Sequence, residues 1–402
     1  MTHRVVLDEL DREGRLVDLT DEEAHALAAS GLVAIRPERD GWRLLPNGSV
    51  GTVRTSRLQV DVLPKGSVGL ADVMFLLGYA RDPGFRPEDV AGSVTDDLLP
   101  ALAHTLLRLS RAALGPGILQ GYRTVEEALP TVRGRIRLSD QLSRRPGLPL
   151  PVEVAHDEFT HDIAENQLLR TAIRRMLAVP RIADSVRREL GHLDGRLTGV
   201  HVVPLRTRRP EWSASRLNAR YVPALRVAEL VLDCLSVDMG ADGSPMTSFV
   251  VNMAAVYEDF VTTALAEALA PYPGTTRAQY PARLDAAELA EGPGITMRVD
   301  LVHLVRKRPA VVFDAKYIAS GPRGYPNANH YQLLAYCTAL DVPVGWLVYA
   351  GRGPVQEYRI ANTDITIVEY PLDLSMEPGE LLQRVERLAT DARLHAGALI
   401  GV

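Results

Sequence analysis

Several features are scarce in this sequence, and each scarcity excludes a class of protein. The chain has two cysteines, Cys234 and Cys337, which lie far apart and form no CxxC pair. Neither a disulfide framework nor a structural zinc site is therefore indicated. No run of about 18 apolar residues occurs, which excludes a transmembrane helix. Residues 1–15 are charged throughout and lack an apolar signal region, so we expect a cytoplasmic protein with no membrane partner.

An excess of positive charge is also lacking. The formal net charge is −5, whereas a strongly basic chain would suggest a nucleic-acid partner. Any DNA binding must therefore be local or shared with another subunit. Of the 45 basic residues only Lys65, Lys307 and Lys316 are lysines. GC-rich codon usage is the simplest explanation, but a lysine kept in this background is a candidate for chemistry, because its compact ammonium can act on a single oxygen or water.

The length and the pattern of short segments predict several domains. A chain of 402 residues is longer than most single cores, which rarely pass ~250–300 residues. We predict an α+β protein with a β-rich N-terminal domain over 1–92, a mostly helical middle region over 93–243, and a third domain over 244–402. The glycine-containing segment 240–245 is the best linker candidate.

Local patterns predict individual elements in the first two parts. Alternating segments bounded by turn residues predict strands at Trp42–Pro46, Gly51–Arg54 and Leu58–Leu63. A long helix is expected over 93–114, beginning at Ser93 or Thr95. Apolar spacing predicts further helices at Asn166–Val179, Ile182–Leu193 and Ala219–Leu235, with a short strand or loop at Val200–Pro204.

The third part has a different pattern. Ser248 is a suitable N-cap for a helix that runs to about Leu269. Two strands, a helix and a buried strand follow, at Ile295–Val305, Ala310–Ile318, His330–Leu340 and Val344–Tyr349. The order of elements is αβββαβ if a segment between 276 and 285 is also a strand.

The strands near residue 300 carry the strongest chemical signal. In an antiparallel hairpin with its turn centred on Lys307, Asp300 lies directly opposite Asp314, and Asp314 shares a strand face with Lys316. Two facing carboxylates are destabilising unless something compensates them, and Mg²⁺ or Mn²⁺ suits such oxygen ligands. Lys316 could then orient the attacking water of a phosphodiester hydrolysis. The alternative is that both acids are held by arginine partners at strand ends.

Residues on two helices add to this interpretation. Glu258 lies on the preceding helix, where a further metal-site carboxylate could project, although a solvated position is also possible. Gln332 and Tyr336 are four residues apart on the following helix, so they share a face.

Together these residues resemble the PD-(D/E)XK nucleases, especially the RecB-like branch. The chain is most similar to the McrC family, the nuclease subunits of McrBC-type modification-dependent restriction systems. The resemblance spans most of the chain. Its motifs are Val62-Leu63-Pro64-Lys65, Asp157-Glu158…Asp162…Asn166, Leu217-Asn218…Arg220-Tyr221, Phe249…Asn252-Met253…Tyr257-Glu258-Asp259-Phe260, Asp300…Asp314-Ala315-Lys316 and Gln332-x-x-x-Tyr336. The chain departs from the superfamily's name at Val299, which stands where proline is implied.

The resemblance implies a partner and a site. It implies docking through the N-terminal part onto a hexameric ring of a McrB-like AAA+ GTPase, stimulation of GTP hydrolysis, and Mg²⁺-dependent cutting of double-stranded, methylated DNA. The site residues implied are Asp300, Asp314 and Lys316, with Glu258 as a third metal ligand and Gln332 and Tyr336 as positioning groups. The chain has no GxxxxGK[ST] loop, so the NTPase must be the partner. A stand-alone RecB-like nuclease and a non-cleaving adaptor of an NTPase remain alternatives.

Two other groups of residues are weaker candidates. The cluster His156-Asp157-Glu158…His161-Asp162 matches no zinc spacing, and we predict a polar loop and helix cap there. Lys65 lies at the end of a predicted strand in the expected docking domain. A role in contacting the partner is one interpretation, and the less favoured one.

Overall fold

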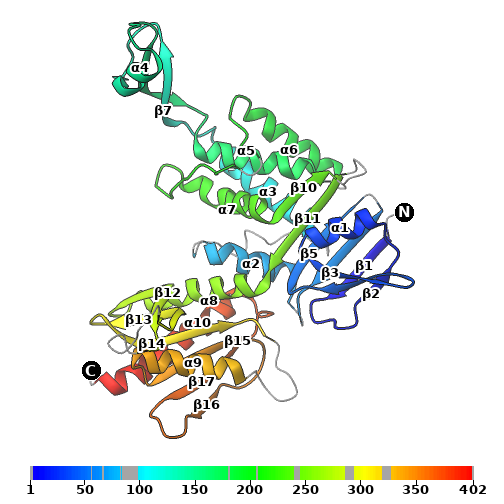
Figure 1. Ribbon diagram of the computed structural model, residues 1–402, viewed down its shortest axis with the longest axis vertical. Coiled ribbons are helices and arrows are strands. Elements are labelled where there is room, and N and C mark those ends of the chain that lie inside the picture. Colours follow the sequence, from blue (N-terminus) through cyan, green and yellow to red (C-terminus); the bar gives the residue numbers. More distant parts are fainter. Residues whose placement is uncertain are drawn as a thin grey trace. The chain divides into compact units, whose positions relative to one another are not determined.

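A computed structural model describes residues 3–55, 57–65, 68–81, 83, 98–179, 182–204, 207–239, 245–285, 294–318 and 327–400. The chain divides into two compact units (Figure 1). The first joins both ends of the chain, Met1–Leu98 and Asp238–Val402, and the second is Leu99–Val237. The linker expected at 240–245 lies almost wholly outside the described residues.

The N-terminal part of the first unit is β-rich, as expected. One sheet places β1 (His3–Asp8), β6 (Leu58–Leu63), β5 (Ser49–Arg54) and β11 (Pro245–Asn252) side by side. A second has the order β2 (Arg15–Val17), β4 (Gly41–Pro46) and β3 (Val33–Glu38), with α1 (Asp21–Ala29) packed on β3. Helix α2 (Leu70–Arg81) follows. The three predicted strands are confirmed as β4, β5 and β6.

The expected start of the long helix after the linker is wrong. Ser248 lies within β11, whose Phe249 pairs with Thr52 of β5 in an antiparallel ladder. Helix α8 (Met253–Leu269) begins five residues later, where the Asn252 side chain accepts a hydrogen bond from the Ala255 N–H. The pairing with β5 holds residues 247–252 in an extended conformation, so the N-cap is Asn252, the next residue with a short side-chain acceptor.

The rest of the first unit is a six-stranded mixed sheet with helices on its faces. Its strand order is β12 (Thr275–Arg283), β13 (Thr296–Val305), β14 (Arg308–Lys316), β15 (Val344–Ala350), β17 (Thr366–Leu372) and β16 (Gln356–Arg359). β12, β13 and β14 are antiparallel, whereas β14, β15 and β17 run parallel. With α9 (Asn327–Leu340), the order α8-β12-β13-β14-α9-β15 matches the expected αβββαβ, and α10 (Pro378–Ile400) ends the chain.

A tight turn and one irregularity together set the register of the central hairpin. Arg306 and Lys307 have φ values of 50° and 66°, the left-handed conformation at both central positions that two-residue hairpins favour. Leu301 pairs with Phe313 and His303 with Val311, and one irregularity follows His303. Next to the turn, Val305 pairs with Arg308, one residue away from the expected register. The irregularity shifts the pairing by one residue, so that from His303 onward the register is the one expected from the sequence.

The second unit was expected to be mostly helical, and this is only partly correct. It contains a three-stranded sheet of order β7-β9-β8 beside its helices. Figure 1 shows β7 and α4 projecting away from α5, α6 and α7 of the same unit. Its elements are α3 (Leu98–Leu114), β7 (Gly121–Leu129), β8 (Arg135–Ile136), α4 (Leu138–Arg144), β9 (Val152–Thr160), α5 (Ala164–Leu177), α6 (Asp184–Arg196), the 3₁₀ turn η2 (Ala219–Tyr221), α7 (Val222–Cys234) and the start of β10 (Leu235–Met239).

The sequence did not predict this sheet, because β7 becomes a strand through its pairing with β9 and has no strand pattern of its own. β7 is largely exposed, so it lacks the apolar alternation that marks a strand, and its extended form depends on the nine-residue ladder with β9. Val200–Pro204 forms no strand, and the expected start of α3 at Ser93 or Thr95 lies outside the described residues. Within the described part of the chain, no helix combines the length and apolar character needed to cross a membrane.

Candidate active site

Two buried carboxylates face each other in the central hairpin. Asp300 in β13 is 8% exposed and Asp314 in β14 is fully buried. The ladder pairs Leu301 with Phe313, so Asp300 and Asp314 occupy the next opposed position. Oδ2 of Asp300 also accepts a hydrogen bond of 3.0 Å from the Ala315 N–H. The hairpin register therefore brings together the two acids that the sequence pattern singled out.

Lys316 completes a charged triad with these acids. Its Nζ lies 2.8 Å from both carboxylate oxygens of Asp314 and 3.8 Å from Oδ2 of Asp300. Burial raises the pKa of Asp314 to about 7, against the lowering effect of Lys316 and with a further raising effect of Asp300. Burial alone would lower the pKa of Lys316, but the Asp314 and Asp300 charges outweigh it and raise that pKa.

The acid pair has the properties expected of a site for a hard divalent cation. Oδ2 of Asp314 is buried and accepts no hydrogen bond from the residues that the structure describes, although the Lys316 ammonium lies 2.8 Å from it as an ion pair. An added cation would satisfy this oxygen and relieve the repulsion between the acids. Mg²⁺ is commonly bound through only one or two carboxylates, with water and phosphate oxygens as its other ligands.

A larger ligand cluster is not formed. Over the described ranges, no three His, Cys, Asp or Glu side chains gather closely enough to hold a metal ion. Two acids without sulfur or imidazole suit Mg²⁺ or Mn²⁺ better than zinc. The residues present therefore fit the cation that the sequence suggested.

Glu258 of α8 lies at the edge of this charged group. Burial is the main cause that raises the pKa of its carboxyl, and the Asp300 charge raises it further, while Gln279 and Lys316 lower it. Its Oε1 accepts a hydrogen bond of 2.7 Å from Gln279 Nε2. Glu258 is thus close enough to interact electrostatically with the triad without forming a three-acid cluster, and its role as a metal ligand stays a prediction.

Gln332 and Tyr336 approach the triad from α9. Gln332 Nε2 donates a hydrogen bond of 2.7 Å to the Tyr336 hydroxyl, so the expected shared helix face is confirmed. Tyr336 is 4% exposed. Burial raises the pKa of its hydroxyl, and the nearby Asp314 charge raises it further. All six residues selected from the sequence thus belong to the first unit.

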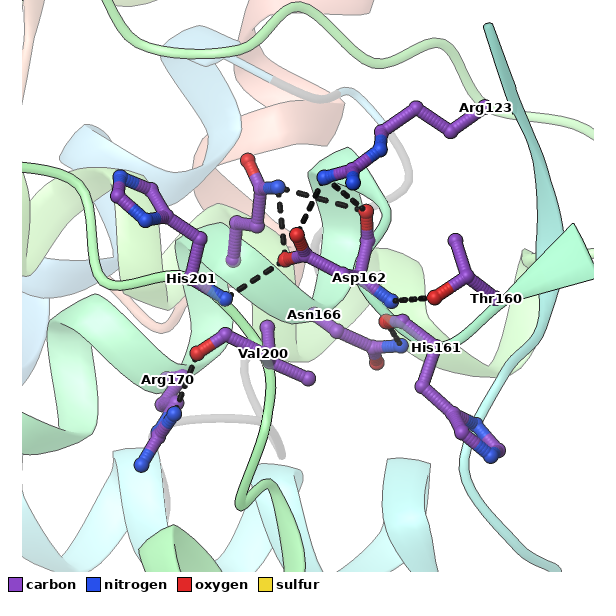
Figure 2. Close-up of polar contacts among 9 residues, drawn as sticks. Arg123, Thr160, His161, Asp162, Asn166, Arg170, Val200 and His201 are labelled. Atoms are coloured by element: carbon purple, nitrogen blue, oxygen red, sulfur yellow. Dashed lines mark hydrogen bonds and ion pairs between the residues drawn. The ribbon is translucent and has the colours of Figure 1, made fainter. Parts of the chain in front are cut away.

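A separate polar cluster lies in the second unit, where Figure 2 shows Asp162 at its centre. Its Oδ1 accepts hydrogen bonds from Gln167 Nε2 (2.8 Å) and the His201 N–H (2.6 Å), and Arg123 pairs with its other oxygen. Burial opposes these contacts, but together they lower the pKa of Asp162. The cluster ties β7 and the loop at His201 to α5.

The expected helix cap at this cluster is wrong, because the N-cap of α5 is Ile163, which supplies no side-chain hydrogen bond. Asp157 and Glu158 lie in β9 rather than in a loop. A cavity of about 530 Å³ adjoins the cluster, and no motif in the sequence predicted it. Its lining consists of residues 119–124, 162–165, 167, 210, 215, 217 and 218.

Comparison with known families identifies the chain. The model of the family described as McrBC 5-methylcytosine restriction system component matches residues 44–350, more than half of the sequence. The chain belongs to the McrBC family. The family membership predicted from the motifs is thus confirmed.

One solved structure has a matching fold. The chain is 18% identical, with a TM-score of 0.61, to a chain of the assembly of Thermococcus gammatolerans McrB AAA+ hexamers with bound McrC, covering 96% of this chain and 99% of that one. A chain of the Thermococcus gammatolerans McrBC complex is also 18% identical, with a TM-score of 0.38, over 67% of this chain and 89% of that one. The comparison with curated proteins gave no match.

Proposed function

We propose that this chain is the DNA-cleaving, McrC-type subunit of a McrBC-like restriction system, with a PD-(D/E)XK site formed by Asp300, Asp314 and Lys316. The observation that carries the proposal is the buried acid pair with an ammonium 2.8 Å from Asp314. The order α8-β12-β13-β14-α9-β15 and membership of the McrBC family support it.

Each residue of the site has a role in this proposal. Asp300 and Asp314 would hold Mg²⁺, or Mn²⁺ in its place, which polarises a phosphoryl oxygen and acidifies a water when bound. The Lys316 ammonium orients the attacking water and offsets negative charge on the phosphorus. Glu258 adds an acidic group at the edge of the site, and Gln332 and Tyr336 position the site or the DNA backbone.

A partner is part of the proposal. The similar solved assembly contains McrB AAA+ hexamers with bound McrC, and we propose that this chain binds and stimulates a McrB-like AAA+ GTPase hexamer in the cytoplasm. The net charge of −5 suits a subunit whose double-stranded, methylated DNA is delivered by that partner. Because the chain lacks a phosphate-binding P-loop, nucleotide hydrolysis takes place in the other chain.

The test is cleavage of methylated and unmethylated plasmid DNA in Mg²⁺ and GTP, with and without the McrB-like AAA+ partner. Lys316→Met is the test variant. Lys307→Met is the matched control, because Lys307 is exposed in the hairpin turn. We expect partner-dependent cutting of methylated DNA by the wild type and the control, and none by Lys316→Met.

The other outcomes favour the alternatives. Cutting without the partner would indicate a stand-alone nuclease. Partner binding and NTPase stimulation with no cutting in any condition would indicate an adaptor. Cutting by Lys316→Met at the wild-type rate would show that the site is wrongly assigned.

A further inference from the structure

Lys65 lies over the ring of a tyrosine, Tyr317, whose neighbour in the chain is the proposed catalytic lysine, Lys316. Tyr317 directly follows Lys316 at the end of β14. Lys65 comes shortly after β6 of the N-terminal sheet, and its Nζ lies 3.8 Å from the centroid of the Tyr317 ring. A cation at this distance over an aromatic face is attracted by the ring quadrupole. The N-terminal sheet is thus in contact with the residue next to the proposed catalytic lysine.

Glu9 joins the same contact through its carboxylate. Its Oε2 accepts a hydrogen bond of 2.9 Å from the Tyr317 hydroxyl and one of 3.1 Å from the Lys65 backbone N–H. Glu9 and Lys65 come from the same end of the N-terminal sheet, because β1 and β6 run parallel and pair up to Asp8 and Leu63. A single carboxylate oxygen therefore connects the ends of β1, β6 and β14, and we call Glu9, Lys65 and Tyr317 the Tyr317 clamp.

The clamp is buried at a cost in free energy. Lys65 is 8% exposed, and its Nζ makes no hydrogen bond within the part of the chain that the structure describes. Burial lowers the pKa of Lys65 to about 8, although Glu9 opposes this, and burial raises the pKa of Glu9. Burying an ammonium without a hydrogen bond from the described residues costs free energy, and such perturbed groups are concentrated at functional sites.

A second ring contact connects Tyr317 to the helix that carries Glu258. The Tyr257 ring of α8 lies 6.0 Å from the Tyr317 ring, measured between centroids. Tyr257 is followed directly by Glu258, as Tyr317 follows Lys316. The Tyr317 ring is thus in contact with the N-terminal sheet and with α8, and the chain neighbours of both tyrosines belong to the charged group around Asp314.

We propose that Glu9 and Lys65 are positioning residues for the nuclease site, which hold Tyr317 and, through it, fix Lys316 at its distance from Asp314. This inference rests on the proposed function. Displacing a reacting group by about 1 Å can lower a catalytic rate ~10²-fold, so loosening the clamp lowers kcat. DNA affinity and NTPase stimulation do not depend on this distance and are unaffected.

The test uses the full chain with its AAA+ partner, methylated plasmid DNA and Mg²⁺. Tyr317→Phe removes the hydroxyl bound by Glu9, and Lys65→Met removes the ammonium but keeps the length of the side chain. Tyr272→Phe is the matched control, since Tyr272 also has a cation over its ring (Arg393, 4.7 Å) and a hydroxyl partner (Thr390, 3.4 Å), both in α10.

Both test variants should lower kcat by about 10-fold, with the KM for DNA and the NTPase stimulation near their wild-type values. Lys65→Arg, which keeps a cation over the ring, should recover part of the loss. Tyr272→Phe should cleave as the wild type does.

A second measurement is independent of cleavage. The Ala315 N–H donates to Asp300 Oδ2, so hydrogen exchange at this amide reports whether the acid pair is assembled. We expect faster exchange in Tyr317→Phe and Lys65→Met than in the wild type. Unchanged kcat and unchanged exchange in both variants would overturn the inference, and so would a parallel loss of kcat, DNA affinity and NTPase stimulation.

Failure of the proposed function is recognised separately. If Asp314→Asn cleaves DNA as well as the wild type does, the site assignment is wrong. Exchange at the Ala315 amide then still decides whether the clamp fixes the end of β14.

Discussion

Replacing Asp314 with asparagine should stabilise the metal-free protein while abolishing the proposed cleavage. The Asp314 carboxyl is fully buried, faces Asp300, and has one oxygen without a hydrogen bond among the described residues. Its pKa is held at about 7, which means that the folded protein disfavours the ionised form. Asparagine has nearly the same size and shape but no charge, so the variant avoids this unfavourable interaction.

The size of the effect follows from the pKa of Asp314. One pKa unit corresponds to ~1.4 kcal/mol. A carboxyl with an ordinary pKa of 3.8 and a folded-state pKa of about 7 therefore destabilises the folded state by at most ~4 kcal/mol at neutral pH. In the variant the Lys316 ammonium still has Asp300 as an ion-pair partner, since its Nζ lies 3.8 Å from Asp300 Oδ2. We expect the variant to gain ~2 to 4 kcal/mol in its free energy of unfolding.

The gain should depend on pH in a defined direction. The folded-state pKa of Asp314 lies above its ordinary value, so the associated stability is fully present below pH 3.8 and is lost as the pH rises through about 7. The wild type loses this stability and the variant does not. The difference between them should therefore grow by ~2 kcal/mol from about pH 5.5 to about pH 8.

Urea denaturation in EDTA, followed by circular dichroism at these two pH values, measures the difference. Asp364→Asn is the control, because the Asp364 side chain is fully exposed and its replacement should leave the free energy of unfolding unchanged. The reasoning is refuted if Asp314→Asn is no more stable than the wild type at the higher pH. It is also refuted if the difference does not increase with pH.

Three further predictions concern the same unit. Mg²⁺ should raise the melting temperature of the wild type but not of Asp314→Asn, and equal increases in thermal melts would contradict the metal site. Lys316→Met should lower the cleavage rate of the complex by ~10²-fold or more, and a rate within twofold of the wild type would refute its role. Gly345→Ala should destabilise the fold by ~1–3 kcal/mol, because the added Cβ would lie 2.6 Å from the Cys337 Sγ. Gly379→Ala, where nothing lies within 4 Å, is its control, and equal urea midpoints for both would contradict this packing.

The candidate site could be predicted from the sequence because its geometry is local. The two-residue turn at Arg306 and Lys307, together with the one-residue shift after His303, fixes the hairpin register, and strand alternation then places Asp314 and Lys316 on one face. The spacing of Gln332 and Tyr336 likewise fixes a shared helix face, which their hydrogen bond confirms. Each of these relations depends on residues fewer than twenty positions apart, so periodicity and turn chemistry determine them.

Tertiary contacts determined the features that sequence patterns predicted wrongly or did not predict. Residues 247–252 are extended because they pair with β5, nearly two hundred residues earlier, and this pairing overrides the cap expected at Ser248. Glu9 and Tyr317 are 308 positions apart, and no local pattern could place them together. The periodicity of strands and helices in the sequence determines which face of its element each residue occupies. Only the packing of distant segments determines which side chains share a buried environment away from water. That environment in turn determines how far the pKa values of these side chains are shifted.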